Sequence, residues 1–205
     1  MADRWKSLLT RALGGNTDAR FHVDAPGAAA GVSRAVAALV SDLLAERESL
    51  LVVCVGTDRS IGDALGPLVG TLLEEQGGHS FPVLGTLDQP VHASNLAETL
   101  LHIETAYPRP LVLAVDACLG RTESVGSLTV SPGPLRPGAG VNKSLPPVGE
   151  IHLTGVVNVG GFMEYFVLQN TRLNLVMRMA KVIARGLSDG LSDLTLMTGA
   201  RAAPR

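Results

Sequence analysis

Three aspartates stand in this sequence at positions where a carboxyl group could act on a bound ligand. Asp58 and Asp63 follow an apolar run at residues 50–55, and Asp116 lies in a second apolar run at residues 111–117. Two carboxyl groups held close together do not both ionise easily, so the pair supplies a general acid and a general base. Two such carboxylates can instead bind a metal ion. The residue types and their spacing leave both chemistries open.

The elements expected around these aspartates would bring them together. The two apolar runs are typical of strands buried on both faces. Further strands are predicted at residues 81–87, 126–133 and 150–157, and helices at residues 33–48, 65–76, 93–105 and 162–185. This order predicts an α/β fold, a three-layer α/β/α domain with a largely parallel sheet. If the strands at 50–55 and 111–117 are neighbours, Asp63 and Asp116 face each other beyond the carboxyl ends of the sheet.

A structural role for Asp63 is the alternative, because an aspartate before an apolar helix is often an N-cap. Pro67 favours a loop position for Asp63, since proline prefers the first position of a helix. Arg59 and Ser60 are candidates for contact with an anion, although the segment lacks a phosphate-binding loop motif. His92 is a candidate base or metal ligand, with a surface or capping histidine as the alternative.

Composition excludes several classes of partner. The chain of 205 residues carries a net charge of -2 and only 3% aromatic residues, so we expect no nucleic-acid binding. No apolar run reaches the roughly 18 residues of a membrane span, and no signal peptide is expected. Cys54 and Cys118 lie in apolar runs without metal-ligand spacing, which is typical of buried, reduced thiols in a cytoplasmic protein.

The domain organisation expected from the sequence is simple. Residues 1–30 are predicted to form an N-terminal arm, and residues 31–205 a single α/β/α domain. The apolar face of the helix at 162–185 would pack into the core or into a homo-oligomer. Between residues 131 and 149, nine of nineteen residues are Gly or Pro. A long loop of this composition in a compact domain is more often functional than structural.

Three segments carry a resemblance to a known family. They read "GTDRSIGDALGP", "LVLAVDACLGRTESVGSLTVSPGPLRPGAGVNK" and "GEIHLTGVVNVGG", and the likeness covers about residues 50–185. Together they resemble the spore germination protease superfamily, and most closely its shorter YyaC-type sporulation relatives. The resemblance implies a phosphorylase/hydrolase-like fold, shared with the hydrogenase maturation peptidases. It also implies an aspartate-dependent endopeptidase of sporulation or germination, in the forespore or spore interior, acting on small acid-soluble spore proteins.

The resemblance also assigns roles to residues. The two catalytic aspartates of the family match Asp63 in "DALGP" and Asp116 in "VDA". The hydrogenase maturation peptidases recognise nickel with a carboxylate, an aspartate and a histidine, and only His92 is a candidate for the third ligand. We therefore expect no cofactor, with nickel or another divalent metal as the alternative. A non-catalytic protein that binds a peptide or partner protein in the same crevice is the other alternative.

The remaining candidates would hold a peptide or small protein substrate. Asp58 and Arg59 are predicted to bind it beside the catalytic pair. The Gly-rich loop contributes Gly140, Asn142 and Lys143, whose backbone N–H groups and side chains are predicted to hold the substrate backbone or an oxyanion. For Lys143, a solvated loop charge is the alternative.

Overall fold

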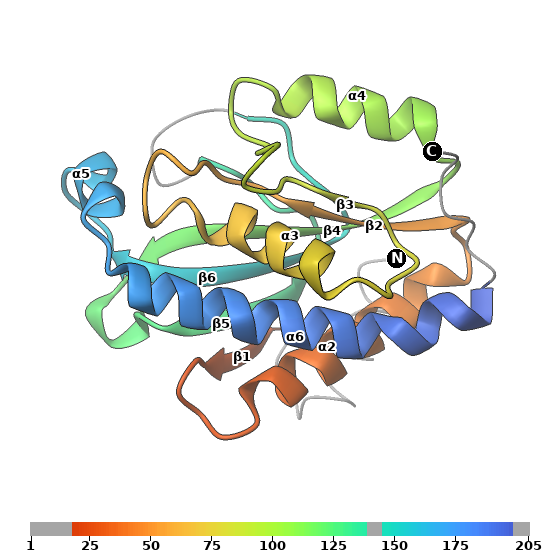
Figure 1. The fold of residues 1–205 in the computed structure, drawn as a ribbon, viewed down its shortest axis with the longest axis horizontal. Coiled ribbons are helices and arrows are strands. Elements are labelled where there is room, and N and C mark those ends of the chain that lie inside the picture. The colour runs from red at the N-terminus through yellow and green to blue at the C-terminus, as the bar shows by residue number, and fades with distance from the viewer. Residues whose placement is uncertain (1–17, 139–144, 199–205) are drawn as a thin grey trace.

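A six-stranded sheet forms the centre of the computed structural model, which describes residues 18–138 and 145–198 (Figure 1). The strands are β1 (Ala19–His22), β2 (Ser49–Cys54), β3 (Val83–Leu84), β4 (Pro110–Gly120), β5 (Ser127–Pro132) and β6 (Ile151–Val159). The helices are α2 (Ala28–Leu44), α3 (Leu65–Gln76), α4 (Leu96–Ala106), α5 (Glu164–Gln169) and α6 (Leu173–Thr198), with a short 3-10 helix at Thr122–Ser124. None of the described helices is both long and apolar enough to cross a membrane.

The strand order is β1-β5-β6-β4-β2-β3, and only β5 runs against its neighbours. Helices α2, α3 and α6 cover one face of the sheet and α4 covers the other (Figure 1). Alternate residues of each central strand enter the two cores: Val52 packs under α3 and α6, and Val53 packs under α4. The predicted three-layer α/β/α class with a largely parallel sheet is confirmed.

The pairing of β2 with β4 decides where the site lies. The two strands are parallel neighbours, with Ser49 opposite Pro110 and Cys54 opposite Val115. Their carboxyl ends therefore meet at one edge of the sheet, as the prediction required. Gly66 lets α3 approach this edge closely, because a Cβ atom there would lie 2.0 Å from the carbonyl oxygen of Val55.

The prediction that residues 1–30 form an N-terminal arm is wrong for the last part of that segment. Residues 19–22 form strand β1, which pairs antiparallel with β5, and α2 begins at Ala28 rather than at residue 33. A four-residue strand is too short to show a clear alternation of apolar and polar residues. The start of α2 depends on Gly27, which takes a left-handed conformation with φ of 77°. Residues 1–17 lie outside the described part of the chain.

The single helix predicted at residues 162–185 is also wrong, since the structure divides it into α5 and α6. Polar side chains in the break bind the backbone: the Thr171 hydroxyl donates to the carbonyl of Val167, and the Asn170 amide donates to that of Phe166. Such local bonds compete with helix continuation. Phe162 and Phe166 consequently point to solvent, with Phe162 82% exposed, instead of joining the buried face of α6.

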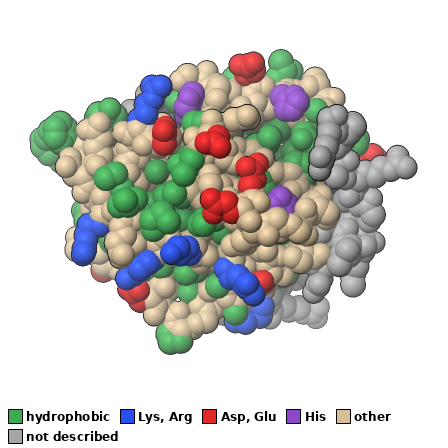
Figure 2. Space-filling view, in the orientation of Figure 1, with side chains coloured by type: hydrophobic (Ala, Val, Ile, Leu, Met, Phe, Trp, Pro, Cys, Tyr) green, Lys and Arg blue, Asp and Glu red, His purple; other side chains and the backbone are tan. Residues whose placement is uncertain are grey.

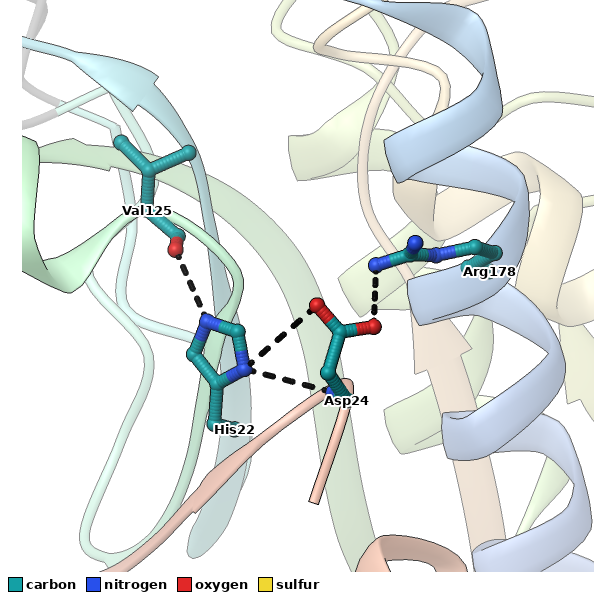
Figure 3. A network of polar contacts seen from close by, with 4 residues as sticks. All are labelled: His22, Asp24, Val125 and Arg178. Atoms are coloured by element: carbon teal, nitrogen blue, oxygen red, sulfur yellow. Dashed lines mark hydrogen bonds and ion pairs between the residues drawn. The ribbon is translucent and has the colours of Figure 1, made fainter.

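A polar network joins the loop after β1 to the rest of the domain (Figure 3). The backbone N–H of Asp24 donates to Nδ1 of His22 at 3.3 Å, and Nε2 of the same ring lies 3.2 Å from the carbonyl oxygen of Val125. Arg178 of α6 pairs with the carboxylate of Asp24. Because both partners of this ion pair are about half exposed, its contribution to stability is below about 1 kcal/mol.

Candidate active site

A cavity of about 670 Å³ opens at the carboxyl ends of β2 and β4, and we call it the aspartate cavity. Asp63 from the loop after β2 and Asp116 from β4 both line it. Apolar walls come from Leu119, Leu135 and Leu168. Its volume and its mixture of apolar walls with a few polar groups are typical of small-molecule or peptide sites. The structure thus brings together the two aspartates that the sequence predicted as a pair.

Asp116 is the buried member of the pair. It is 9% exposed and lies opposite Thr154 of the neighbouring strand β6. Burial raises the pKa of the Asp116 carboxyl well above its ordinary value, and the negative charge of Asp63 raises it further. A hydrogen bond of 2.8 Å from the backbone N–H of Ala117 acts in the opposite direction and is the smallest of the three effects. A carboxyl in this position is held protonated where an exposed one is ionised.

Asp63 is half-buried and lies at the end of a tightly held loop. The backbone N–H of Thr57 donates to the carbonyl of Asp63 at 3.2 Å, and that of Gly62 donates to the carbonyl of Leu168 at 2.9 Å. The N-cap of α3 is Ala64, whose side chain makes no capping hydrogen bond. Asp63 therefore directly precedes the N-cap of α3 and lines the aspartate cavity, and the alternative of a structural role for it stays a prediction.

The predicted substrate-binding residues fall into three groups. Arg59 lines the aspartate cavity and is exposed, whereas Asp58 is exposed and lies outside the cavity wall, so its predicted role is not supported by its position. Gly140, Asn142 and Lys143 lie outside the described residues. Gly138 and Leu145, on either side of that segment, do line the cavity.

Several wall residues were not singled out as site residues from the sequence. Arg136 lies in the Gly- and Pro-rich loop at residues 131–149 but was not proposed as a site residue, and Tyr165 lies in the predicted helix at residues 162–185. Thr154 and Cys118 were assigned only to strands. Cys54 and Cys118 are free thiols, as predicted, but only Cys54 is fully buried. The one signal available for Cys118 was its position two residues after Asp116, since alternate residues of a strand share a face.

His92 lies between the aspartate cavity and a second cavity of about 650 Å³. The second cavity, which we call the acidic cavity, is lined by Glu74, Asp88 and Glu98. Figure 2 shows acidic and histidine side chains gathered between α3 and α4, with Lys and Arg lying mainly below them. His92 directly precedes the turn into α4, where its backbone N–H donates to Oδ1 of Asn95 at 2.8 Å.

Among residues 18–138 and 145–198, no three His, Cys, Asp or Glu side chains are grouped closely enough to hold an ion. Asp63, Asp116 and His92 share one cavity wall, but they do not form such a group. The predicted alternative of nickel or another divalent metal stays a prediction.

Fold and site together define an α/β/α domain with a carboxyl pair in a cavity at the carboxyl ends of its strands. Residues 22–186 match a family described as "Protein of unknown function (DUF1256)", and the chain belongs to this family. It is 60% identical over 146 residues to the uncharacterized protein YyaC of Bacillus subtilis (strain 168), covering 71% of this chain and 70% of that protein. The predicted resemblance to YyaC-type proteins is confirmed, and membership of the spore germination protease superfamily stays a prediction.

One solved structure has a related arrangement. A [NiFe] hydrogenase maturation protease, HycI from Thermococcus kodakarensis KOD1, matches 73% of this chain and 99% of its own. The TM-score is 0.45 and the sequence identity is 16%. A likeness of this degree carries no argument about the reaction or its residues, which depend on the site rather than on the fold.

Proposed function

We propose that this protein is a peptidase in which Asp116 and Asp63 hydrolyse a peptide bond as an acid–base pair. The main observation behind the proposal is the position of Asp116, a buried residue that lines a cavity. The charge of Asp63 helps to raise the pKa of its carboxyl. Pairs of titratable groups whose environments separate their pKa values are typical of acid–base sites. The resemblance in sequence to aspartate-dependent spore proteases supports the same assignment.

The two environments suggest which aspartate plays which role. Asp63, which is less buried, acts as the carboxylate that takes a proton from water while the water oxygen attacks the carbonyl carbon. Asp116 gives its proton to the amide nitrogen as the C–N bond breaks. The products are a carboxylic acid and an amine, and transfer of a proton from Asp63 through solvent to Asp116 restores the pair. The proposed rate falls as pH rises through the pKa of Asp116, because the acid is then lost.

The proposed substrate is a peptide or small protein, and the resemblance favours the small acid-soluble spore proteins of the forespore or spore interior. The test is intact-mass spectrometry of such a protein incubated with the enzyme from acid to neutral pH. We expect defined fragments from the wild type and none from Asp116→Asn or Asp63→Asn. Asp42→Asn, on the exposed side of α2, is the matched control and should cleave normally.

Fragments that persist in Asp116→Asn would overturn the proposed mechanism, because an amide cannot supply the required proton. Fragments absent with every variant, the wild type included, would reject the spore proteins as substrate. A digest of random peptides would then test peptidase activity without regard to sequence.

A second candidate function is the binding of a partner protein without turnover. It is favoured by exposed apolar side chains at and before α5, of which Phe162, Tyr165 and Phe166 are more than half exposed. Tyr165 also lines the aspartate cavity, so a partner could contact both surfaces. This candidate predicts that a captured partner stays intact and that its binding tolerates Asp63→Asn.

A homo-oligomer formed through the same side chains stays a prediction, tested by sedimentation of the wild type and Phe162→Ser.

A further inference from the structure

Two residues that line the aspartate cavity each have a buried side-chain atom without a hydrogen-bond partner. Among the side chains that the structure describes, three buried nitrogen or oxygen atoms lack a hydrogen-bond partner: Ser60 Oγ, Ser80 Oγ and His92 Nδ1. Ser60 and His92 both line the aspartate cavity, whereas Ser80 lines neither cavity described above. An unpaired buried polar atom costs about 1–3 kcal/mol, so its presence calls for an explanation.

Ser60 is held in place by its backbone and not by its side chain. It is 7% exposed, and its carbonyl accepts the backbone N–H of Ala64 at 3.0 Å. The hydroxyl stands three residues before Asp63 in the same loop. A serine hydroxyl both donates and accepts, so it can bind either half of an amide group.

His92 is held in a similar way. Its backbone N–H and carbonyl are both bonded to Asn95, while its ring Nδ1 has no partner among the described residues. In contrast, ring nitrogens of His22, His79 and His152 lie within hydrogen-bond distance of a backbone carbonyl. His92 therefore has a fixed backbone and a buried ring nitrogen that lacks a partner among the described residues.

The surroundings restrict the chemistry of that ligand. An anion bound beside Asp63 and Asp116 would be repelled by any ionised carboxylate of the pair, and a cation would meet Arg59 and Arg136 in the same wall. An uncharged group with one donor and one acceptor can pair with both Ser60 Oγ and His92 Nδ1, and neither the carboxylates nor the arginines repel it. The leucine walls add apolar contact on either side of it.

We propose that Ser60 and His92 hydrogen-bond the backbone of a peptide segment bound in the aspartate cavity, and so position its amide beside Asp63 and Asp116. The inference depends on the proposed function for the identity of the ligand, and it assigns to that ligand two binding residues outside the carboxyl pair. Ser60 is a positioning residue here and not a nucleophile.

The experiment measures binding separately from cleavage. The probe is a pool of acetylated and amidated hexapeptides of random sequence, added to the Asp116→Asn protein, which the proposed reaction cannot turn over. The protein has five histidines, so the ring C–H signals in an NMR spectrum can be assigned with single His→Gln variants. We expect the His92 signals to shift on titration and those of His22, His79 and His152 to stay in place.

The matched pair of variants is Ser60→Ala and Ser80→Ala, made in the same background. Each removes one buried, unpaired hydroxyl, so neither should destabilise the fold. We expect Ser60→Ala to raise the Kd of the pool about threefold to tenfold, and Ser80→Ala to leave it unchanged. An unmoved His92 signal, or equal Kd values for the two alanine variants, would overturn the proposal.

Failure of the proposed function gives a different result. Binding with the expected pattern, together with a wild type that cleaves no peptide, would leave the two binding residues in place and reject hydrolysis. Cleavage by the wild type with an unchanged KM in the Ser60→Ala single variant would support hydrolysis and reject the role of Ser60.

Discussion

The negative charge of Asp63 raises the pKa of Asp116, although Asp63 lies in the loop after β2 and Asp116 lies within β4. Their interaction exists because β2 and β4 are parallel neighbours, which sets both strand ends at one edge. Burial of Asp116 is the larger cause of the shift, and the charge of Asp63 adds to it. Asp116 therefore has a measurable signature, a raised pKa that depends in part on Asp63.

Asp116→Asn should change how stability depends on pH. The folded pKa of Asp116 lies above its ordinary value of 3.8, so between these two values the folded protein keeps a proton that the unfolded chain loses. Its contribution to the free energy of unfolding falls as pH rises through this window, by at most about 1.4 kcal/mol per pH unit. In urea unfolding from pH 4 to pH 8, the free energy of unfolding of the variant should increase relative to that of the wild type as pH rises. A constant difference between the two would contradict the raised pKa.

Asp63→Asn should lower the pKa of Asp116 without restoring its ordinary value, because the burial remains. Infrared difference spectra over a pH series, with 13C-labelled aspartate, report the protonated carboxyl of Asp116 through its C=O stretch. We expect the midpoint pH of this titration to be lower in Asp63→Asn than in the wild type, and unchanged in Asp42→Asn. An unchanged midpoint in Asp63→Asn would mean that the two carboxyls do not interact.

Cys118 should be a slow nucleophile although it lines the cavity. Burial and the nearby Asp116 raise the pKa of its thiol to about 11. Because the thiolate is the reactive form, alkylation by iodoacetamide should accelerate up to about pH 11 in the folded protein. Cys54, which is fully buried, should react only after unfolding. Peptide mapping by mass spectrometry separates the two sites, and rapid labelling of Cys118 at pH 7 would contradict this prediction.

Gly66→Ala should destabilise the protein, although alanine usually stabilises a helix relative to glycine by about 1 kcal/mol. The added Cβ would lie 2.0 Å from the backbone carbonyl oxygen of Val55, so the start of α3 or the end of β2 must move. We expect a loss of at least about 2 kcal/mol in the free energy of unfolding. Gly31→Ala is the milder comparison, because the atoms nearest to its added Cβ belong to the side chain of Phe21, which can move more easily than a backbone carbonyl. Equal unfolding free energies for the two variants would contradict this account.

The central strands and the helix between them were predictable because each has a strong local signal. The apolar run at residues 50–55 became β2, and the predicted helix at 65–76 has the bounds of α3. A strand buried on both faces must be apolar throughout, and a helix packed on a sheet must repeat its apolar residues at helical spacing. Strand β1 and the break before α6 escaped prediction because they depend on partners distant in the sequence and on side-chain bonds to the backbone.

The sequence by itself determined the fold class and both candidate carboxyls, because strand and helix patterns and the residues within or after each strand are local properties. Only the tertiary structure decided that β2 lies beside β4, that Asp116 is buried and Asp58 is not, and that Ser60 and His92 have unpaired atoms in one cavity wall. The physical reason is that pKa values, burial and hydrogen-bond satisfaction depend on what surrounds a side chain in space. Those neighbours come from segments whose pairing is set by the packing of the whole domain.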